Sequence, residues 1–169
     1  MTIAPDAGRT GDTVSDVVFS IPGEPKGKGR PRFSKPKGSQ FVRTYTPDAT
    51  VDYENRVKAM YAYGGFPKLE GPIRMTMVMY FGIPSSGISK KSRQYMIDRE
   101  ILPTKKVDLD NACKIVMDAL NGVAFDDDKQ IIELRAKKLY SELPRVVVKL
   151  HQYTILERIK NLFRIEKEK

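Results

Sequence analysis

Apolar and polar residues alternate along residues 73–81, the most regular pattern in the chain. Every second position in this run is apolar: Ile73, Met75, Met77, Met79 and Phe81. Because side chains two apart lie on the same face of an extended backbone, the run predicts a strand that is buried on one face. Similar patterns predict three more strands, over residues 17–21, 132–136 and 145–153.

Three segments between these strands predict helices. Thr46-Pro47-Asp48 is typical of a helix start, with Thr46 as the cap and Pro47 in the first turn. Residues 90–100 predict a short basic helix. A third helix is expected to begin at Asp110 or Asn111, and its apolar residues at spacings of three and four predict a buried stripe. That stripe contains Leu109, Cys113, Val116 and Leu120.

The order of these elements predicts an α/β (mixed α+β) fold. We expect a small mixed β-sheet of about four strands, packed with two or three helices in a single domain. A chain of 169 residues is long enough for one such domain. We place it at residues 17–153, between a disordered lead-in at 1–16 and a C-terminal helical extension at 154–169.

The composition limits the chemistry that the domain can perform. Lys and Arg number 30 against 21 Asp and Glu, a formal net charge of +9 that favours a polyanionic partner, nucleic acid before a membrane. One Cys and one His exclude an intrachain disulfide, a Cys/His zinc cluster and a nuclease built on paired histidines. The sequence contains no apolar run typical of a membrane span or a signal peptide, so we expect a cytoplasmic protein.

Most of the excess positive charge lies between residues 26 and 43, an interval without acidic residues. Its basic residues are candidates for DNA binding: Lys26, Lys28, Arg30, Arg32, Lys35, Lys37 and Arg43. Interleaved glycines allow a backbone to approach a phosphate closely, and Arg30 and Arg32 flank Pro31 in the manner of a phosphate clamp. The segment predicts contact with a phosphodiester backbone, although a solvated basic loop has the same composition.

Acidic residues gather in two places. Asp108 and Asp110 lie two apart before the predicted third helix, so they share one face of an extended chain, and Lys114 lies one turn further on the polar face. The second group, residues 126–128, precedes the strand that starts near Ile131. If that strand returns the second group to the first, three or four carboxylates converge in one place.

A convergence of carboxylates is the oxygen-rich environment that Mg²⁺ prefers, with Mn²⁺ as a substitute. Such a metal activates a water and neutralises charge on a scissile phosphate, and Lys114 would stabilise the charge that develops. Each feature alone has a structural explanation, because Asp110 can cap a helix and an aspartate triplet can be a solvated loop. Their combination beside a basic segment favours a metal-dependent phosphodiesterase.

Three short motifs resemble the signature of RusA-type Holliday-junction resolvases. They are Val107-Asp108-Leu109-Asp110-Asn111-Ala112-Cys113-Lys114, Asp118-Ala119-Leu120-Asn121-Gly122 and Asp127-Asp128-Lys129-Gln130-Ile131. The basic run that starts at Pro25 is also similar to the entry segment of phage and prophage members. The resemblance implies a homodimeric, Mg²⁺-dependent endonuclease that resolves four-way junctions by paired nicks during DNA recombination and repair. Its place would be the cytoplasm of a bacterial host or of a phage-infected cell.

By this resemblance, the catalytic residues are Asp108, Asp110, Lys114 and Asp128. The three aspartates would also hold the metal, with Asp127 as the alternative to Asp128. Two other functions stay open. A non-catalytic nucleic-acid-binding protein is disfavoured because acids that face DNA repel it unless a metal bridges them. A metal phosphohydrolase acting on nucleotides is disfavoured because a mononucleotide does not require seven clustered cations.

Overall fold

The computed structural model describes residues 16–30, 32–34, 41, 43–104, 107–154 and 157, with only the backbone of residues 32, 34 and 43–45. The predicted lead-in at 1–16, apart from Asp16, and the predicted extension at 154–169, apart from Thr154 and Glu157, lie outside these residues. Within the described part of the chain, no helix is long and apolar enough to cross a membrane.

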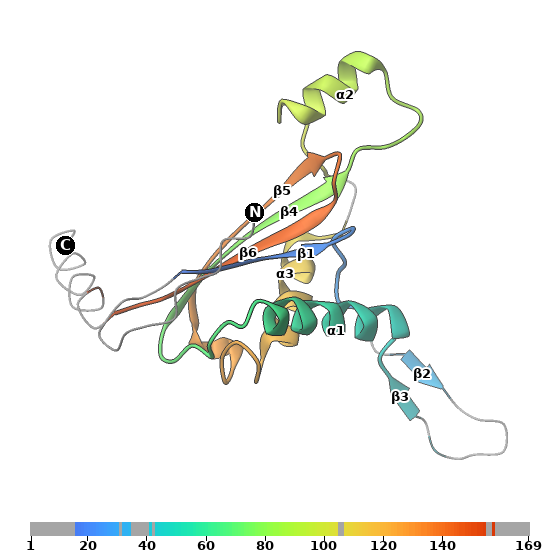
Figure 1. Cartoon of the computed structure of the whole chain (residues 1–169). Helices are drawn as coiled ribbons and strands as arrows, with labels where there is room; N and C mark the ends of the chain where they lie inside the picture. The colour runs from blue at the N-terminus through green and yellow to red at the C-terminus, as the bar shows by residue number, and fades with distance from the viewer. Residues whose placement is uncertain are drawn as a thin grey trace, which may run out of the picture.

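Four strands form one open mixed sheet, as the sequence predicts (Figure 1). They are β1 (Val17–Pro22), β4 (Ile73–Gly82), β5 (Ile131–Ser141) and β6 (Arg145–Gln152), in the order β1-β6-β4-β5. β4 pairs with β5 in parallel and with β6 antiparallel, and β1 pairs antiparallel with β6. The mixed α+β fold is therefore confirmed.

Three helices accompany the sheet: α1 (Asp48–Tyr63), α2 (Lys90–Ile97) and α3 (Leu109–Leu120). α1 and α3 contact each other and cover one face of the sheet, whereas α2 lies at its far end against β5 (Figure 1). A short 3-10 helix, η1 (Asp128–Gln130), precedes β5, and a two-stranded ribbon of β2 (Arg32–Ser34) and β3 (Arg43–Tyr45) projects away from the sheet near the start of α1.

The core lies between the sheet and the two helices that cover it. The alternating residues of β4 point into this layer, where Met75, Met77 and Met79 are completely buried. The opposite side of the core is formed by α3, whose buried residues are Ala112, Cys113, Ile115, Val116, Ala119 and Leu120. Burial raises the pKa of the Cys113 thiol to about 11, with a further contribution from the nearby Asp110 charge. Cys113 is thus an unreactive core residue at neutral pH.

Two details of the helix predictions are wrong. Leu109 does not belong to the buried stripe and is 37% exposed, because it is the first residue of α3 and precedes the part of the helix that packs on the sheet. Thr46 does not cap α1, because Pro47 occupies the N-cap position and no side chain makes a capping hydrogen bond there.

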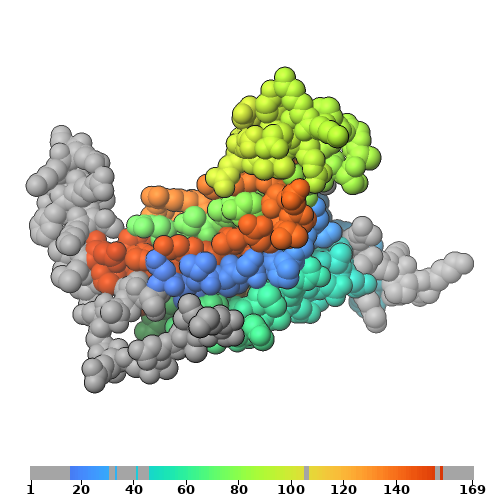
Figure 2. Space-filling model, turned by 45° about the horizontal axis from the view of Figure 1, so that its top comes forward, coloured from blue at the N-terminus to red at the C-terminus, as the bar shows by residue number. Residues whose placement is uncertain are grey.

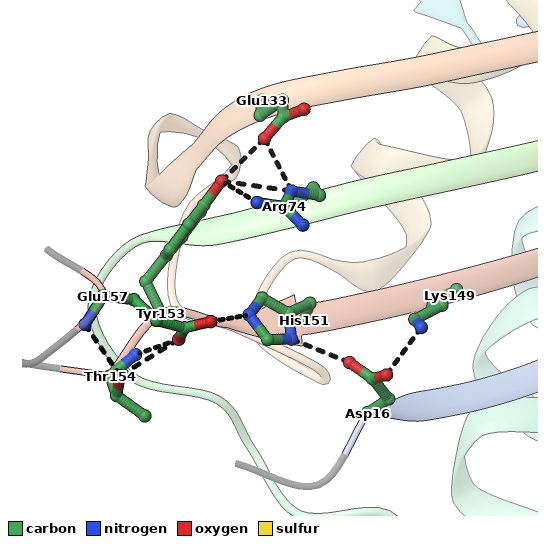
Figure 3. Close-up of polar contacts among 8 residues, drawn as sticks. All are labelled: Asp16, Arg74, Glu133, Lys149, His151, Tyr153, Thr154 and Glu157. Atoms are coloured by element: carbon green, nitrogen blue, oxygen red, sulfur yellow. Dashed lines mark hydrogen bonds and ion pairs between the residues drawn. The ribbon is translucent and has the colours of Figure 1, made fainter. Parts of the chain in front are cut away.

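Hydrogen bonds and ion pairs link the strands at one end of the sheet, where β4 and β5 begin and β6 ends (Figure 3). Glu133 on β5 accepts hydrogen bonds from Arg74 Nε on β4 and from the Tyr153 hydroxyl, each at 2.6 Å. These two hydrogen bonds lower the pKa of Glu133 to about 2, with that from Tyr153 contributing most. Beside them, His151 lies between Asp16, at 2.7 Å from Nδ1, and Glu157, at 3.2 Å from Nε2.

The Glu133 network predicts a loss of stability in acid. A carboxyl group with a pKa lowered by folding stabilises the fold above its unfolded value of 4.5, and this contribution disappears as the pH falls towards 2. Glu133→Gln is expected to lower the free energy of unfolding at pH 7 by about 1 kcal/mol, a figure reduced for partial exposure, and to flatten the decline between pH 4.5 and 2. Urea titrations across this range measure both effects.

The matched control is Glu142→Gln, which removes a more exposed acid from its ion pair with Arg93. It should change the stability little at either pH. An acid profile for Glu133→Gln as steep as that of the wild type would contradict a role for this network.

Candidate active site

The two aspartates of the first acidic group lie at the start of α3. Asp108 is the N-cap residue, and its backbone carbonyl accepts the first helical hydrogen bond from Ala112 N at 3.0 Å. Its side chain makes no capping hydrogen bond. Asp110 follows in the first turn, where the helix dipole favours negative charge. Both side chains are exposed, so these carboxylates are accessible to a metal ion or a substrate.

The start of α3 is anchored to the sheet immediately before these residues. Lys138 Nζ on β5 donates a hydrogen bond to the Val107 carbonyl oxygen at 3.2 Å. Val107 itself packs against the hydrophobic core. The backbone that presents Asp108 is thereby held against β5.

The basic segment docks on the same helix through Lys28. Its ammonium group forms ion pairs with Asp118 and, at 3.3 Å, with Glu54 of α1. Lys28 N also donates to the Asn111 carbonyl oxygen at 3.3 Å. Burial alone would lower the pKa of Lys28, but the hydrogen bond and charge of Asp118, with a smaller contribution from Glu54, raise it. Lys28 is thus a partly buried cation that joins the basic segment to α1 and α3.

Glycine is required at position 27 for this close approach. A Cβ atom placed on Gly27 would lie 2.5 Å from Val107 Cγ1 and 2.6 Å from Asn111 Nδ2. Both neighbours belong to the first acidic motif. The contact between two segments about 80 residues apart explains one of the glycines in the basic run.

Lys114 lies on the exposed side of α3. Its side chain is 60% exposed, and its Nζ is 3.8 Å from Asp118 Oδ1. Asp118 therefore faces two cations, Lys28 and Lys114. The sequence gave no indication that Lys28 is a partner of Asp118, because that pairing depends on the tertiary fold.

The other basic candidates are distributed along the ribbon and the irregular segment between β1 and β2. Lys26 and Arg30 are exposed, and Arg32 and Arg43 lie in β2 and β3. Lys35 and Lys37 fall outside the described residues. Their proposed role in DNA binding stays a prediction.

The second acidic group lies around η1. The Asp127 carboxylate accepts a hydrogen bond from Lys129 N at 3.0 Å, and the Gln130 side chain reaches back to Asp127 N at 3.2 Å. This reciprocal pair is a capping box, and the backbone hydrogen bond from Lys129 lowers the pKa of Asp127. Asp127 therefore has a structural role. The spacing of an acid three residues before a Gln contains the signal that could have identified it.

The two acidic groups do not meet within one chain. Asp128 precedes the first residue of β5 by three positions, whereas Lys138, which holds the start of α3, lies seven residues into the strand. Seven residues of strand span about 23 Å. The expected convergence of the two acidic groups is therefore wrong for a single chain. Because α3 runs opposite to β5, Asp108 and Asp128 lie near opposite ends of β5.

Among the described residues, no group of three or more His, Cys, Asp or Glu side chains could hold a metal ion. Mg²⁺ nevertheless commonly uses one or two protein carboxylates, with water and substrate phosphate completing its octahedron. Asp108 and Asp110 are of the right chemistry for that kind of site.

Two comparisons with known proteins agree with this arrangement. The family model described as endodeoxyribonuclease RusA matches residues 22–151, a span that includes the basic run and both acidic groups. An uncharacterized protein of Bacillus subtilis (strain 168), YqaN, is 34% identical over 139 residues, which cover 80% of this chain and 96% of the relative.

Proposed function

Because the chain belongs to the RusA endodeoxyribonuclease family, we propose that it is a Mg²⁺-dependent resolvase that hydrolyses paired phosphodiesters of a four-way DNA junction. The observation that supports this most is the Asp108 carboxylate, which is exposed at the start of α3 and makes no capping hydrogen bond. A carboxylate retained only for helix capping would make that bond. This argues against the alternative of a non-catalytic DNA-binding protein.

In this proposal each residue at the start of α3 has a separate task. Asp108 and Asp110 would hold Mg²⁺, which supplies an activated water and neutralises charge on the scissile phosphate. Lys114, one turn along the exposed side of the helix, places a cation where negative charge develops on the phosphate oxygens. The exposed Lys26 and Arg30 would position the DNA strand through contacts with its phosphates.

A homodimer accounts for the separation of the acids. Asp128 lies too far from Asp108 of its own chain to share a ligand with it, but a two-fold axis can place Asp128 of one protomer beside Asp108 of the other. The same axis matches the paired, equivalent strands of a four-way junction. We therefore propose two active sites per dimer, with each cutting one strand.

Dimers with one wild-type and one Asp110→Asn subunit test this arrangement. They are expected to nick the junction on a single strand, since one of the two sites lacks a metal ligand. A plasmid-borne cruciform distinguishes the products, because one nick gives an open circle and paired nicks give a linear molecule. Linear product formed by mixed dimers at the wild-type rate would contradict one site per subunit.

A further inference from the structure

A cavity of about 450 Å³ lies between α2 and the turn that joins β5 to β6, and none of the aspartates of the two acidic groups lines it. α2 and the adjoining segment project as a lobe beyond the body of the molecule, above β5 and β6 (Figure 2). Two tyrosines and two arginines contribute to the cavity wall: Tyr80, Tyr140, Arg99 and Arg145. The volume is in the range of small-molecule and nucleotide sites.

Arg145 is held in a fixed position at this wall. Its guanidinium carbon lies 4.1 Å from the centroid of the Tyr80 ring. Its Nη1 donates a hydrogen bond to the Leu143 carbonyl oxygen at 2.9 Å. A planar cation stacked on a tyrosine offers a flat surface, a positive charge and further N–H donors.

Arg99 has a backbone conformation that favours glycine. It follows the end of α2 with φ of 67°, and it is the one residue other than glycine with positive φ in the described part of the chain. Arg99 N closes the helix by donating to the Met96 carbonyl oxygen at 3.3 Å. Glycine is the usual residue at this kind of helix end, so an arginine here adds a cation to the cavity wall against a backbone preference.

The cavity is positively charged on balance. Its one acidic residue, Glu142, forms an ion pair with Arg93 of α2 at 2.9 Å. The charges of Arg99 and Arg145 are therefore not cancelled by Glu142. An anionic ligand with a flat ring fits such a wall better than a neutral or cationic one.

The cavity lies at the same end of the sheet as the candidate active site. Tyr140 is two residues beyond Lys138, whose ammonium group anchors Val107 at the start of α3. Tyr80 and Tyr140 both lie near the carboxyl ends of the parallel strands β4 and β5. Ligand sites of open sheets with parallel strands commonly occur at this end.

We propose that this cavity binds one unpaired nucleotide of a DNA strand, with the base stacked against the partly exposed Tyr140, since Arg145 already covers the Tyr80 ring, and the phosphate paired with Arg99 and Arg145. Bases stack on aromatic side chains regardless of their identity, and arginine pairs with phosphate through two N–H donors. This inference rests on the proposed function because it assigns the cavity to the DNA substrate. It assigns recognition of an unstacked base to the same end of the sheet as the start of α3, where cleavage is proposed.

The experiment measures binding of a fluorescein-labelled dT₁₂ oligonucleotide and of the same oligomer with abasic residues, in EDTA, by anisotropy. The wild-type protein is expected to bind dT₁₂ more tightly than the abasic oligomer by roughly 5- to 100-fold, the range for stacking one base. Tyr140→Leu should remove most of this difference. Arg99→Gly should weaken the binding of both oligomers while its melting temperature stays equal to or above that of the wild type.

The control is Lys90→Ala, which removes a cation from α2 that does not line the cavity. Equal affinity of the wild type for the two oligomers, or an unchanged preference in Tyr140→Leu, would overturn the proposal. Glycine suits the positive φ of Arg99, so the Arg99→Gly protein is expected to fold. Its result can therefore be interpreted even if Tyr140→Leu is unstable. Because the assay uses no metal, it is independent of cleavage, and a failure of the nuclease proposal would appear instead as a wild-type protein that binds DNA without cutting it.

Discussion

Asp110→Asn is expected to abolish junction cleavage, by on the order of 10³-fold, while the protein folds normally. The substitution keeps the size of the side chain but removes a charge that would hold Mg²⁺, and a metal ion contributes several kcal/mol of charge stabilisation to phosphodiester hydrolysis. Asp108→Asn should behave in the same way. Rates of cleavage of a labelled junction in Mg²⁺ measure the effect, with melting temperature as the control for folding.

Junction binding distinguishes a metal-binding role of these aspartates from a purely structural role in the helix. In EDTA the two Asn variants should bind the junction as well as the wild type or better, since a negative charge near the phosphates has been removed. Lys114→Ala should also lose cleavage, but loss of its cation cannot strengthen binding. If the Asp110→Asn protein folds and cuts at the wild-type rate, Asp110 is not a metal ligand, and its role is limited to a favourable interaction with the helix dipole.

Phe125→Ala is expected to cause the largest loss of stability. The Phe125 side chain is completely buried in the core, and its backbone carbonyl oxygen accepts a hydrogen bond from Gly122 N at 2.7 Å in the turn after α3. Replacement of a buried Phe by Ala costs about 3–5 kcal/mol, which lowers the melting temperature of a chain of this length by roughly 6–20 °C. Thermal unfolding followed by circular dichroism measures the shift.

Ile132→Ala is the matched control, because Ile132 is 63% exposed on the edge strand β5. Its melting temperature should differ little from that of the wild type. The Phe125 variant should also lose cleavage at temperatures where it is still folded if the turn orients Asp127 and Asp128. A shift of less than about 3 °C for Phe125→Ala would show that the turn after α3 is not part of the cooperative core.

β1, β4, β6, α1 and α3 could be predicted from the sequence because each has one buried face, whereas the apolar positions Ile132 and Leu134 of β5 are exposed on the edge strand. The period-two pattern of Met75, Met77 and Met79 corresponds directly to burial in β4, and the spacing of three and four in α3 corresponds to its buried side. Such patterns depend only on local geometry. They do not show whether the first residue of a helix, such as Leu109, lies within the part of the helix that is buried.

The relations between segments could not be predicted in the same way. The pairing of Lys28 with Asp118 joins residues 90 positions apart, and no local pattern records it. The separation of Asp108 from Asp128 follows from the direction of β5 relative to α3, which periodicity does not define. The role of Asp127 is different, since the capping box with Gln130 is local and was present in the sequence.

Junction-selective, metal-dependent cleavage is tested by comparing a mobile four-way junction with a linear duplex of the same sequence, with Mg²⁺ and with EDTA. We expect paired, symmetric cuts in the junction when Mg²⁺ is present, no cuts in EDTA, and an intact duplex in both conditions. Cleavage of the duplex at a rate similar to that of the junction, or cleavage of the junction in EDTA, would contradict a metal-dependent resolvase.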